Sequence, residues 1–88
     1  MASAEENKLE ILKDEVLMLI GKRIQSFREE LGLSQVDLAG KVIGKIDTTN
    51  ISRIESGRTN VTIYTLIRIS IALEISLEDL VKDIPANY

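Results

Sequence analysis

Residues able to do chemistry gather in one short stretch, where the polar run Thr48-Thr49-Asn50 is followed by Arg53. Their hydroxyl, amide and guanidinium groups can donate or accept hydrogen bonds at the edges of nucleic-acid bases. The chain has no cysteine and no histidine, which excludes disulfides, thiolate or imidazole metal sites, cysteine nucleophiles and histidine acid–base chemistry. The acid pairs Glu29-Glu30 and Glu78-Asp79 are helix neighbours that point apart, and no nucleophile–base couple accompanies them. We therefore expect a binding protein and not an enzyme, with no cofactor and no metal.

The elements that position these residues belong to a small chain. With 88 residues, of which 44% are hydrophobic and 28% charged, one compact globular domain is expected. The longest apolar run, residues 16–20, is far shorter than the roughly 18 residues of a membrane helix. The start of the chain lacks the basic and apolar regions of a signal peptide. We expect no membrane association and a cytoplasmic location.

Charge is unevenly distributed, although the net value is −3. Residues 21–73 hold eight Lys or Arg against five Asp or Glu, a local excess of +3. The residues before and after this segment each carry −3. Because salt screens surface charges beyond about 8–10 Å, the basic middle segment is what an anionic partner would meet.

Apolar spacing predicts that the chain is all α-helical. A first helix has its apolar stripe at positions 16, 20, 24, 27 and 31 and is ended by Gly32. Ser34, with Asp37 three residues later, predicts the start of a second helix. Its inner face is expected to consist of Val36, Leu38, Ala39, Val42 and Ile43.

Caps and apolar spacing predict three more helices. Asp47 is expected to cap a third helix over 48–56, with Ile51 and Ile54 facing inward. Thr62 caps a fourth, mostly buried helix carrying Ile63, Leu66, Ile67, Ser70, Ile71 and Leu73. Ser76 caps a fifth helix, stopped by Pro85, whose inner side chains are Leu77, Leu80 and Val81. We expect a partly helical N-terminal extension over 1–15, a helical domain over 16–84 and a tail over 85–88.

The order of these signals resembles a known family. Matching segments include Leu31-Gly32-Leu33-Ser34-Gln35 and Ile51-Ser52-Arg53-Ile54-Glu55-Ser56-Gly57, and residues 20–82 as a whole resemble Xre-family helix-turn-helix regulators. The resemblance implies an all-α, five-helix, phage-repressor-like domain that binds double-stranded DNA sequence-specifically and regulates transcription, as a repressor. This chain departs from the family in the turn before 48–56, which is two residues longer, with Lys45-Ile46 as the expected surplus. Val61 also stands where the family often has proline.

The site residues follow from helix geometry and from the resemblance together. With Ile51 and Ile54 inward, Thr49, Ser52 and Arg53 face outward, flanked by Thr48 and Asn50. Residues expected to contact bases are Thr48, Thr49, Asn50 and Arg53. Residues expected to contact phosphates are Gln35, Lys45, Ser52, Arg58, Thr59 and Asn60. A plainer alternative is that 47–50 is only a capping and turn cluster.

Two further expectations concern structure and assembly. By resemblance, Arg28 and Glu55 form a partly buried ion pair that fixes the third helix. The N-terminal residues Leu9, Leu12, Val16 and Leu19, at spacings of three, four and three, form a narrow apolar seam. This segment either lengthens the first helix and mediates a homodimer, which we favour, or folds back on its own core. A dimer would present two reading helices about 34 Å apart to a palindromic site.

Other functions compete with the regulator. An antitoxin would bind DNA with the same helix and would also neutralise a partner toxin. A regulator could also act together with a separate effector subunit. A protein-bridging module would use the helical fold without reading bases. The hydroxyl- and amide-rich outer face of 48–56 argues against the bridging module, because protein interfaces favour apolar or aromatic anchors.

Overall fold

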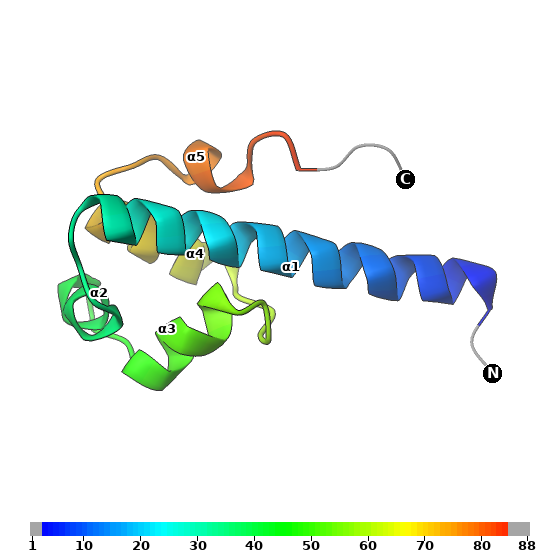
Figure 1. The fold of residues 1–88 in the computed structure, drawn as a ribbon, viewed down its shortest axis with the longest axis horizontal. Coiled ribbons are helices and arrows are strands. Elements are labelled where there is room, and N and C mark those ends of the chain that lie inside the picture. The colour runs from blue at the N-terminus through cyan, green and yellow to red at the C-terminus, as the bar shows by residue number, and fades with distance from the viewer. Residues whose placement is uncertain (1–2, 85–88) are drawn as a thin grey trace.

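The computed structural model describes residues 3–84, and over this range the chain forms five α-helices and no strand (Figure 1). The helices are α1 (Ala4–Glu30), α2 (Gln35–Lys41), α3 (Thr48–Glu55), α4 (Ile63–Ala72) and α5 (Leu77–Val81). The predicted all-α, five-helix architecture is therefore confirmed. Pro85 and the expected tail lie outside the described residues.

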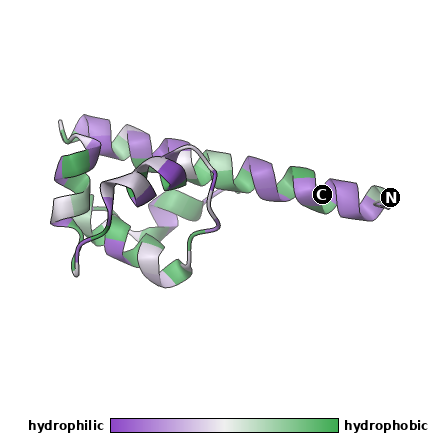
Figure 2. Ribbon diagram, turned by 90° about the horizontal axis from the view of Figure 1, so that it is seen from below, coloured by the Kyte–Doolittle hydropathy of each residue, from purple (hydrophilic) through white to green (hydrophobic). Residues whose placement is uncertain are grey.

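Helix α1 is longer than the apolar stripe predicted. It begins at Ala4 after the N-cap Ser3, whose hydroxyl accepts from the Glu6 backbone N–H while the Glu6 carboxylate accepts from the Ser3 N–H. From there it continues for 27 residues, so the N-terminal segment extends the same helix and does not fold back. Its first half projects beyond the bundle (Figure 1) and carries both hydrophilic and hydrophobic residues (Figure 2). Gly32 ends the helix at φ 70°, as predicted.

All five helices contribute to one core. α5 packs on one side of α1 and α3 on the other, with α4 behind (Figure 1). Each fully buried aliphatic side chain contributes about 1.5–3 kcal/mol relative to an exposed one, so the short helices are stabilised mainly by these contacts. The core consists of Ile20, Ile24, Leu38, Ala39, Val42, Ile51, Ile54, Leu66, Ile69, Ala72, Leu73 and Leu80.

Three residues expected in the first two apolar faces are exposed. Leu31 is 41% exposed because it is the C-cap of α1, where the chain turns away from the core. Val36 lies on the outer side of α2, and Ile43 follows the end of that helix at Lys41. The prediction was wrong at Ile43 because α2 ends before it, and at Leu31 and Val36 because these side chains lie at a helix end and on an outer side.

The inner face of α4 also differs from the prediction. Leu66, Ser70 and Leu73 are buried as expected, but Ile63, Ile67 and Ile71 are exposed. Ile69, which the prediction omitted, is fully buried instead. Isoleucine occurs on two opposite sides of this helix, so the spacing of apolar residues could not identify the side that faces the core.

Glycine at two positions lets α3 approach α1 closely. A Cβ on Gly21 would lie 2.4 Å from the Glu55 carbonyl oxygen and 2.5 Å from that of Ile54. Gly57 follows α3 at φ 74°, and a Cβ there would lie 2.9 Å from the backbone and side chain of Met18. These contacts fix the C-terminal end of α3 against α1 and thereby set the direction in which α3 points.

Candidate nucleic-acid interface

Helix α3 presents a polar edge to solvent. Ile51 is fully buried and Ile54 nearly so, as predicted. Thr49, Asn50 and Arg53 are exposed. Thr48 is half-buried, and so is Ser52, which was expected to face fully outward. The exposed edge therefore combines one hydroxyl, one amide and one guanidinium group.

The start of α3 follows the predicted position but not the predicted chemistry. Asp47 is the N-cap residue, yet its carboxylate makes no capping hydrogen bond. The first turn is closed by backbone bonds alone, from the Asn50 and Ile51 N–H groups to the Asp47 carbonyl, at 2.9 and 3.1 Å. No side chain therefore caps the first turn of α3, which argues against the alternative that 47–50 is only a capping cluster.

The lengthened turn before α3 is held by α4. The Lys45 N–H donates to the Val42 carbonyl at 2.7 Å, with Gly44 at φ 80° in the position where a type II turn needs glycine. The Arg68 side chain donates to the carbonyls of Ile43 at 2.9 Å and Lys45 at 2.7 Å. Ile46, expected as part of the surplus, packs against the core. Lys45 itself is exposed.

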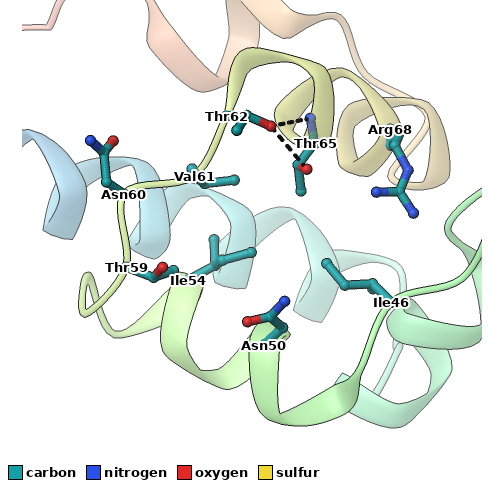
Figure 3. Close-up of a pocket in the computed structure, with 9 residues that line it drawn as sticks. All are labelled: Ile46, Asn50, Ile54, Thr59, Asn60, Val61, Thr62, Thr65 and Arg68. Carbon is teal, nitrogen blue, oxygen red and sulfur yellow. Dashed lines mark hydrogen bonds between the residues drawn. The ribbon is translucent and has the colours of Figure 1, made fainter.

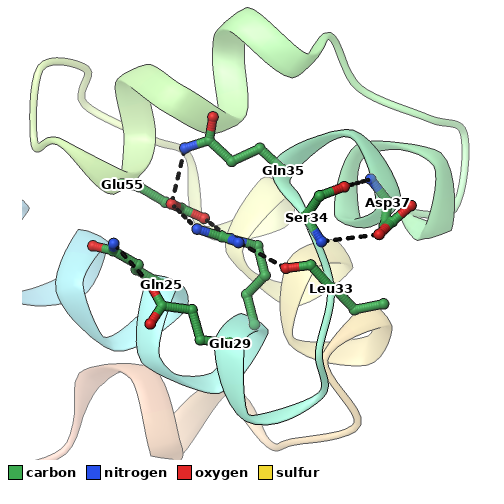
Figure 4. A network of polar contacts seen from close by, with 8 residues as sticks. Gln25, Glu29, Leu33, Ser34, Gln35, Asp37 and Glu55 are labelled. Carbon is green, nitrogen blue, oxygen red and sulfur yellow. Dashed lines mark hydrogen bonds and ion pairs between the residues drawn. The ribbon is translucent and has the colours of Figure 1, made fainter.

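A buried ion pair anchors the other end of α3 (Figure 4). Arg28 donates from Nε and Nη2 to the two carboxylate oxygens of Glu55, at 2.6 and 3.0 Å. Its Nη1 donates to the Leu33 carbonyl at 2.7 Å. The hydrogen bond and charge of Glu55 outweigh burial and raise the pKa of Arg28. A charge pair this enclosed holds α1, α3 and the loop before α2 in one arrangement.

Gln35, expected at a phosphate, has a protein partner that the sequence did not reveal. Its side-chain amide donates to Glu55 Oε1 at 3.0 Å (Figure 4). The contact depends on how α2 crosses α3, which is a tertiary property that no local pattern encodes. Within the described residues, every buried side-chain nitrogen and oxygen has a hydrogen-bond partner, so this network is complete in the structure as it stands.

The segment after α3 borders a groove beside the polar edge. The groove has a volume of about 230 Å³ and lies between α3, the loop and α4 (Figure 3). Of the predicted site residues, Asn50, Thr59 and Asn60 line it. Its other lining residues were not predicted, because α3, the loop after it and α4 bring them together only in the folded chain. These are Ile46, Ile54, Val61, Thr62, Thr65 and Arg68.

The cations around α3 are available to an anionic partner. In the described part of the chain, ion pairs join Arg28 to Glu55 and Lys82 to Asp79. Neither involves Lys45, Arg53 or Arg58, which are all exposed. Arg58 is oriented locally, with its Nε donating to the Ser56 hydroxyl at 2.8 Å.

Over residues 3–84, no helix is long and apolar enough to cross a membrane. The same residues contain no group of three or more metal-ligating side chains.

Comparison with known proteins places this architecture in a class. The sequence profile of the helix-turn-helix family matches residues 24–80, so the chain belongs to this Xre-like family of DNA-binding transcription regulators. No curated protein matches the sequence.

Two solved structures are similar. One is the restriction-modification controller protein C.AhdI from Aeromonas hydrophila, with 31% identity and a TM-score of 0.68 over 73% of this chain and 94% of that one. The other is the hypothetical transcription factor NHTF from Neisseria, with 25% identity and a TM-score of 0.71 over 78% of this chain and 77% of that one.

Proposed function

We propose that this protein is a sequence-specific transcriptional repressor that reads the major groove of DNA with α3. The observation that carries the proposal is the exposed edge of α3, where Thr49, Asn50 and Arg53 stand opposite the fully buried Ile51. The major groove is about 12 Å wide and accepts a helix presented in this way. The Arg28–Glu55 pair and Gly21 supply the rigid mounting that such a helix needs.

Each polar side chain of α3 has its own role in base recognition. Arg53 can bond O6 and N7 of a guanine through two donors, and Asn50 can bond N6 and N7 of an adenine. Thr48 and Thr49 can contact a thymine methyl group or a base acceptor. Each two-atom contact contributes about 1–3 kcal/mol of discrimination against the wrong base.

Residues around α3 supply affinity through the phosphates. Lys45 and Arg58 are exposed cations before and after the helix, and Ser52, Thr59 and Asn60 add hydroxyl and amide donors. Gln35 uses one amide hydrogen on Glu55, which leaves its second hydrogen for a phosphate. Binding through such contacts weakens steeply with salt, because each neutralised phosphate releases counterions.

Repression follows from occupancy. A domain seated in the major groove excludes other proteins from the same DNA, which requires no chemistry beyond binding. We therefore place the protein with the DNA in the cytoplasm, acting without catalysis, and we propose that it binds as a homodimer across two half-sites.

Selection from random duplex DNA tests the proposal directly. We expect an enriched motif, two half-sites related by symmetry, and an affinity that falls steeply between about 50 and 200 mM salt. A promoter carrying the motif should be silenced when the protein is present in a purified transcription reaction. Enrichment of no motif would overturn the proposal, and transcription that rises with protein concentration would overturn the repressor role.

A further inference from the structure

The turn between α2 and α3 has little support of its own. Gly44 and Lys45 follow one another at φ 80° and 56°, and lysine rarely adopts this left-handed conformation. Over residues 43–46 the backbone makes one hydrogen bond within the turn, from the Lys45 N–H to the Val42 carbonyl. The turn ends at Asp47, whose carboxylate makes no capping bond to α3. The start of α3 therefore depends on a contact from outside the turn.

Arg68 of α4 supplies this contact. Its Nε donates to the Ile43 carbonyl at 2.9 Å, and its Nη2 donates to the Lys45 carbonyl at 2.7 Å. Both donors belong to one rigid, planar fork, so they fix the spacing and the direction of the two carbonyls together. A Cβ on Gly44 would lie 3.4 Å from Arg68 Nη2. The turn thus packs closely against the guanidinium group.

The guanidinium group is itself held in place. Tyr64, one helical turn earlier on α4, places the centre of its ring 5.7 Å from Arg68 Cζ, within the range of a cation–π contact. Neither ion pair of residues 3–84 involves Arg68. Arg68 also lines the groove that contains Ile46 and Asn50 (Figure 3). Its side chain therefore lies beside the first turn of α3 and bonds the segment that leads into it.

We propose that Arg68 is a positioning residue for base recognition, which fixes the first turn of α3 and so determines how strictly Thr49 and Asn50 discriminate bases. This step rests on the proposed function, in which α3 lies in the major groove. The last turn of α3 has a separate anchor in the Arg28–Glu55 pair. Release of the turn before α3 would therefore displace Asn50 more than groups near the anchored end. Hydrogen bonds weaken steeply as their angle closes, so the contact of Asn50 is lost first.

Positioning differs from a direct contact between Arg68 and a DNA phosphate. A phosphate contact needs a positive charge, which lysine also carries. The hold on the turn needs two donors in a fixed plane, and lysine presents its donors from a single nitrogen. We therefore expect Arg68→Lys to behave like Arg68→Met.

Competition binding with single-base variants of the selected site tests the proposal. Asn50→Ala and Arg53→Ala first identify the base pair that each of these side chains reads. In Arg68→Met and Arg68→Lys, we expect discrimination at the Asn50 base pair to fall about tenfold, the size of one two-atom contact, and discrimination at the Arg53 base pair to change less than about twofold. The salt dependence of binding should keep its wild-type slope, because no phosphate contact is lost.

Arg23→Met is the matched control. Arg23 also donates to two backbone carbonyls, those of Leu80 and Lys82 at the end of α5. Helix α5 packs on the side of α1 opposite α3 (Figure 1). Loss of this arginine removes the same kind of contact far from the reading helix, so discrimination should stay at the wild-type level at every base pair.

Amide hydrogen exchange without DNA measures the hold on the turn directly. The N–H groups of Lys45, Asn50 and Ile51 are hydrogen-bonded in the turn or in the first turn of α3. We expect them to exchange about tenfold faster in Arg68→Met, because local opening becomes easier. The Gly57 N–H, bonded at the anchored end of α3, should keep its wild-type rate. Circular dichroism verifies that each variant is folded.

The proposal is overturned if the amides of the turn exchange at wild-type rates in Arg68→Met, or if Arg68→Lys keeps wild-type discrimination. It is equally overturned if the salt dependence falls by about one counterion, which would assign Arg68 to a phosphate, or if Arg23→Met loses the same discrimination. The proposed function is read separately. A wild-type protein that enriches no motif, together with faster exchange in Arg68→Met, would refute that function and leave the hold of Arg68 on the turn intact.

Discussion

Helices α3 and α4 are alike on the inside and opposite on the outside. Each is short, at eight and ten residues, and each buries one isoleucine completely, Ile51 in α3 and Ile69 in α4. Outward, α3 presents Thr49, Asn50 and Arg53, whereas α4 presents its row of isoleucines. Hydrogen-bonding groups suit base edges and apolar groups suit another protein surface. The same core thus supports one polar and one apolar outer surface.

The largest effect should come from removing the carboxylate that anchors α3. In Glu55→Ala the Arg28 guanidinium, in a residue only 8% exposed, stays buried without a counter-charge. We expect the free energy of unfolding to fall by about 3–5 kcal/mol, measured by urea denaturation. Neither ion pair of the described residues involves α4. Glu55→Ala therefore tests how α3 is anchored and leaves α4 unchanged.

A paired replacement is the control for the ion pair. Arg28→Met combined with Glu55→Leu leaves no unpaired charge in the interior, so it should cost less stability than Glu55→Ala. If the double variant is as unstable as the single one, the pair acts through packing and not through charge.

A methyl group at the α1–α3 contact should have the next largest effect. In Gly21→Ala the new Cβ meets backbone oxygen at 2.4 Å, so α3 must shift, at a cost of about 2–3 kcal/mol. Gly40→Ala is the matched control, because a Cβ there meets nothing within 4 Å, and it should be neutral or stabilising by about 0.5–1 kcal/mol. We expect DNA affinity to fall only in Gly21→Ala. Equal thermal unfolding of the two variants would show that α3 tolerates displacement.

Much of the fold could be predicted because its signals are local. Ser34, Thr62 and Ser76 each accept a hydrogen bond from the N–H three residues later, so a few neighbouring residues determine where those helices begin. The alternation of Ile51 and Ile54 with polar residues likewise identifies the inner side of α3. These features depend on spacing alone, which a sequence displays directly.

What could not be predicted depends on how helices cross. The outward side of α4 was missed because isoleucine lies on both its inner and its outer side, so only packing against α2 and α5 decides which side is buried. The bond from Gln35 to Glu55 and the hold of Arg68 on the turn join residues 20 or more positions apart. No local pattern carries this information.

Substitutions on the outer edge of α3 and in the loop after it should change recognition without changing stability. We expect Arg53→Ala to reduce discrimination at one base pair by about 1–3 kcal/mol. Arg58→Ala should instead weaken binding to all duplexes alike and lower the salt dependence by about one counterion. Competition binding with single-base variants of the selected site measures both. If both variants lost the same affinity on specific and on random DNA, these roles would be contradicted. If both variants kept the wild-type oligomeric mass, the outer edge of α3 would be shown to act on DNA alone, unlike the apolar side of α4.

The smallest expected effect is on the pH dependence of stability. It concerns two capping boxes, one on a helix that packs on α3 and one on a helix that packs on α4. Asp37 completes the capping box of α2, which packs on α3, and Asp79 completes the capping box of α5, which packs on α4. Hydrogen bonds from the Ser34 backbone and side chain lower the pKa of Asp37, and those from Ser76 lower the pKa of Asp79. A carboxylate whose pKa is lower in the folded state stabilises the fold above its unfolded-state pKa. That stabilisation is lost as the pH falls through the folded-state pKa.

Thermal unfolding followed between about pH 5 and pH 2 should therefore show a shallower decline in Asp37→Asn than in wild type, since asparagine does not titrate there. Asp79→Asn should flatten the curve in the same direction, and the double variant should add the two effects, because the caps lie on different helices without shared partners. At pH 7 both variants should be slightly less stable than wild type, since the charged acceptor is gone. A decline as steep in the double variant as in wild type would assign acid sensitivity to other carboxylates.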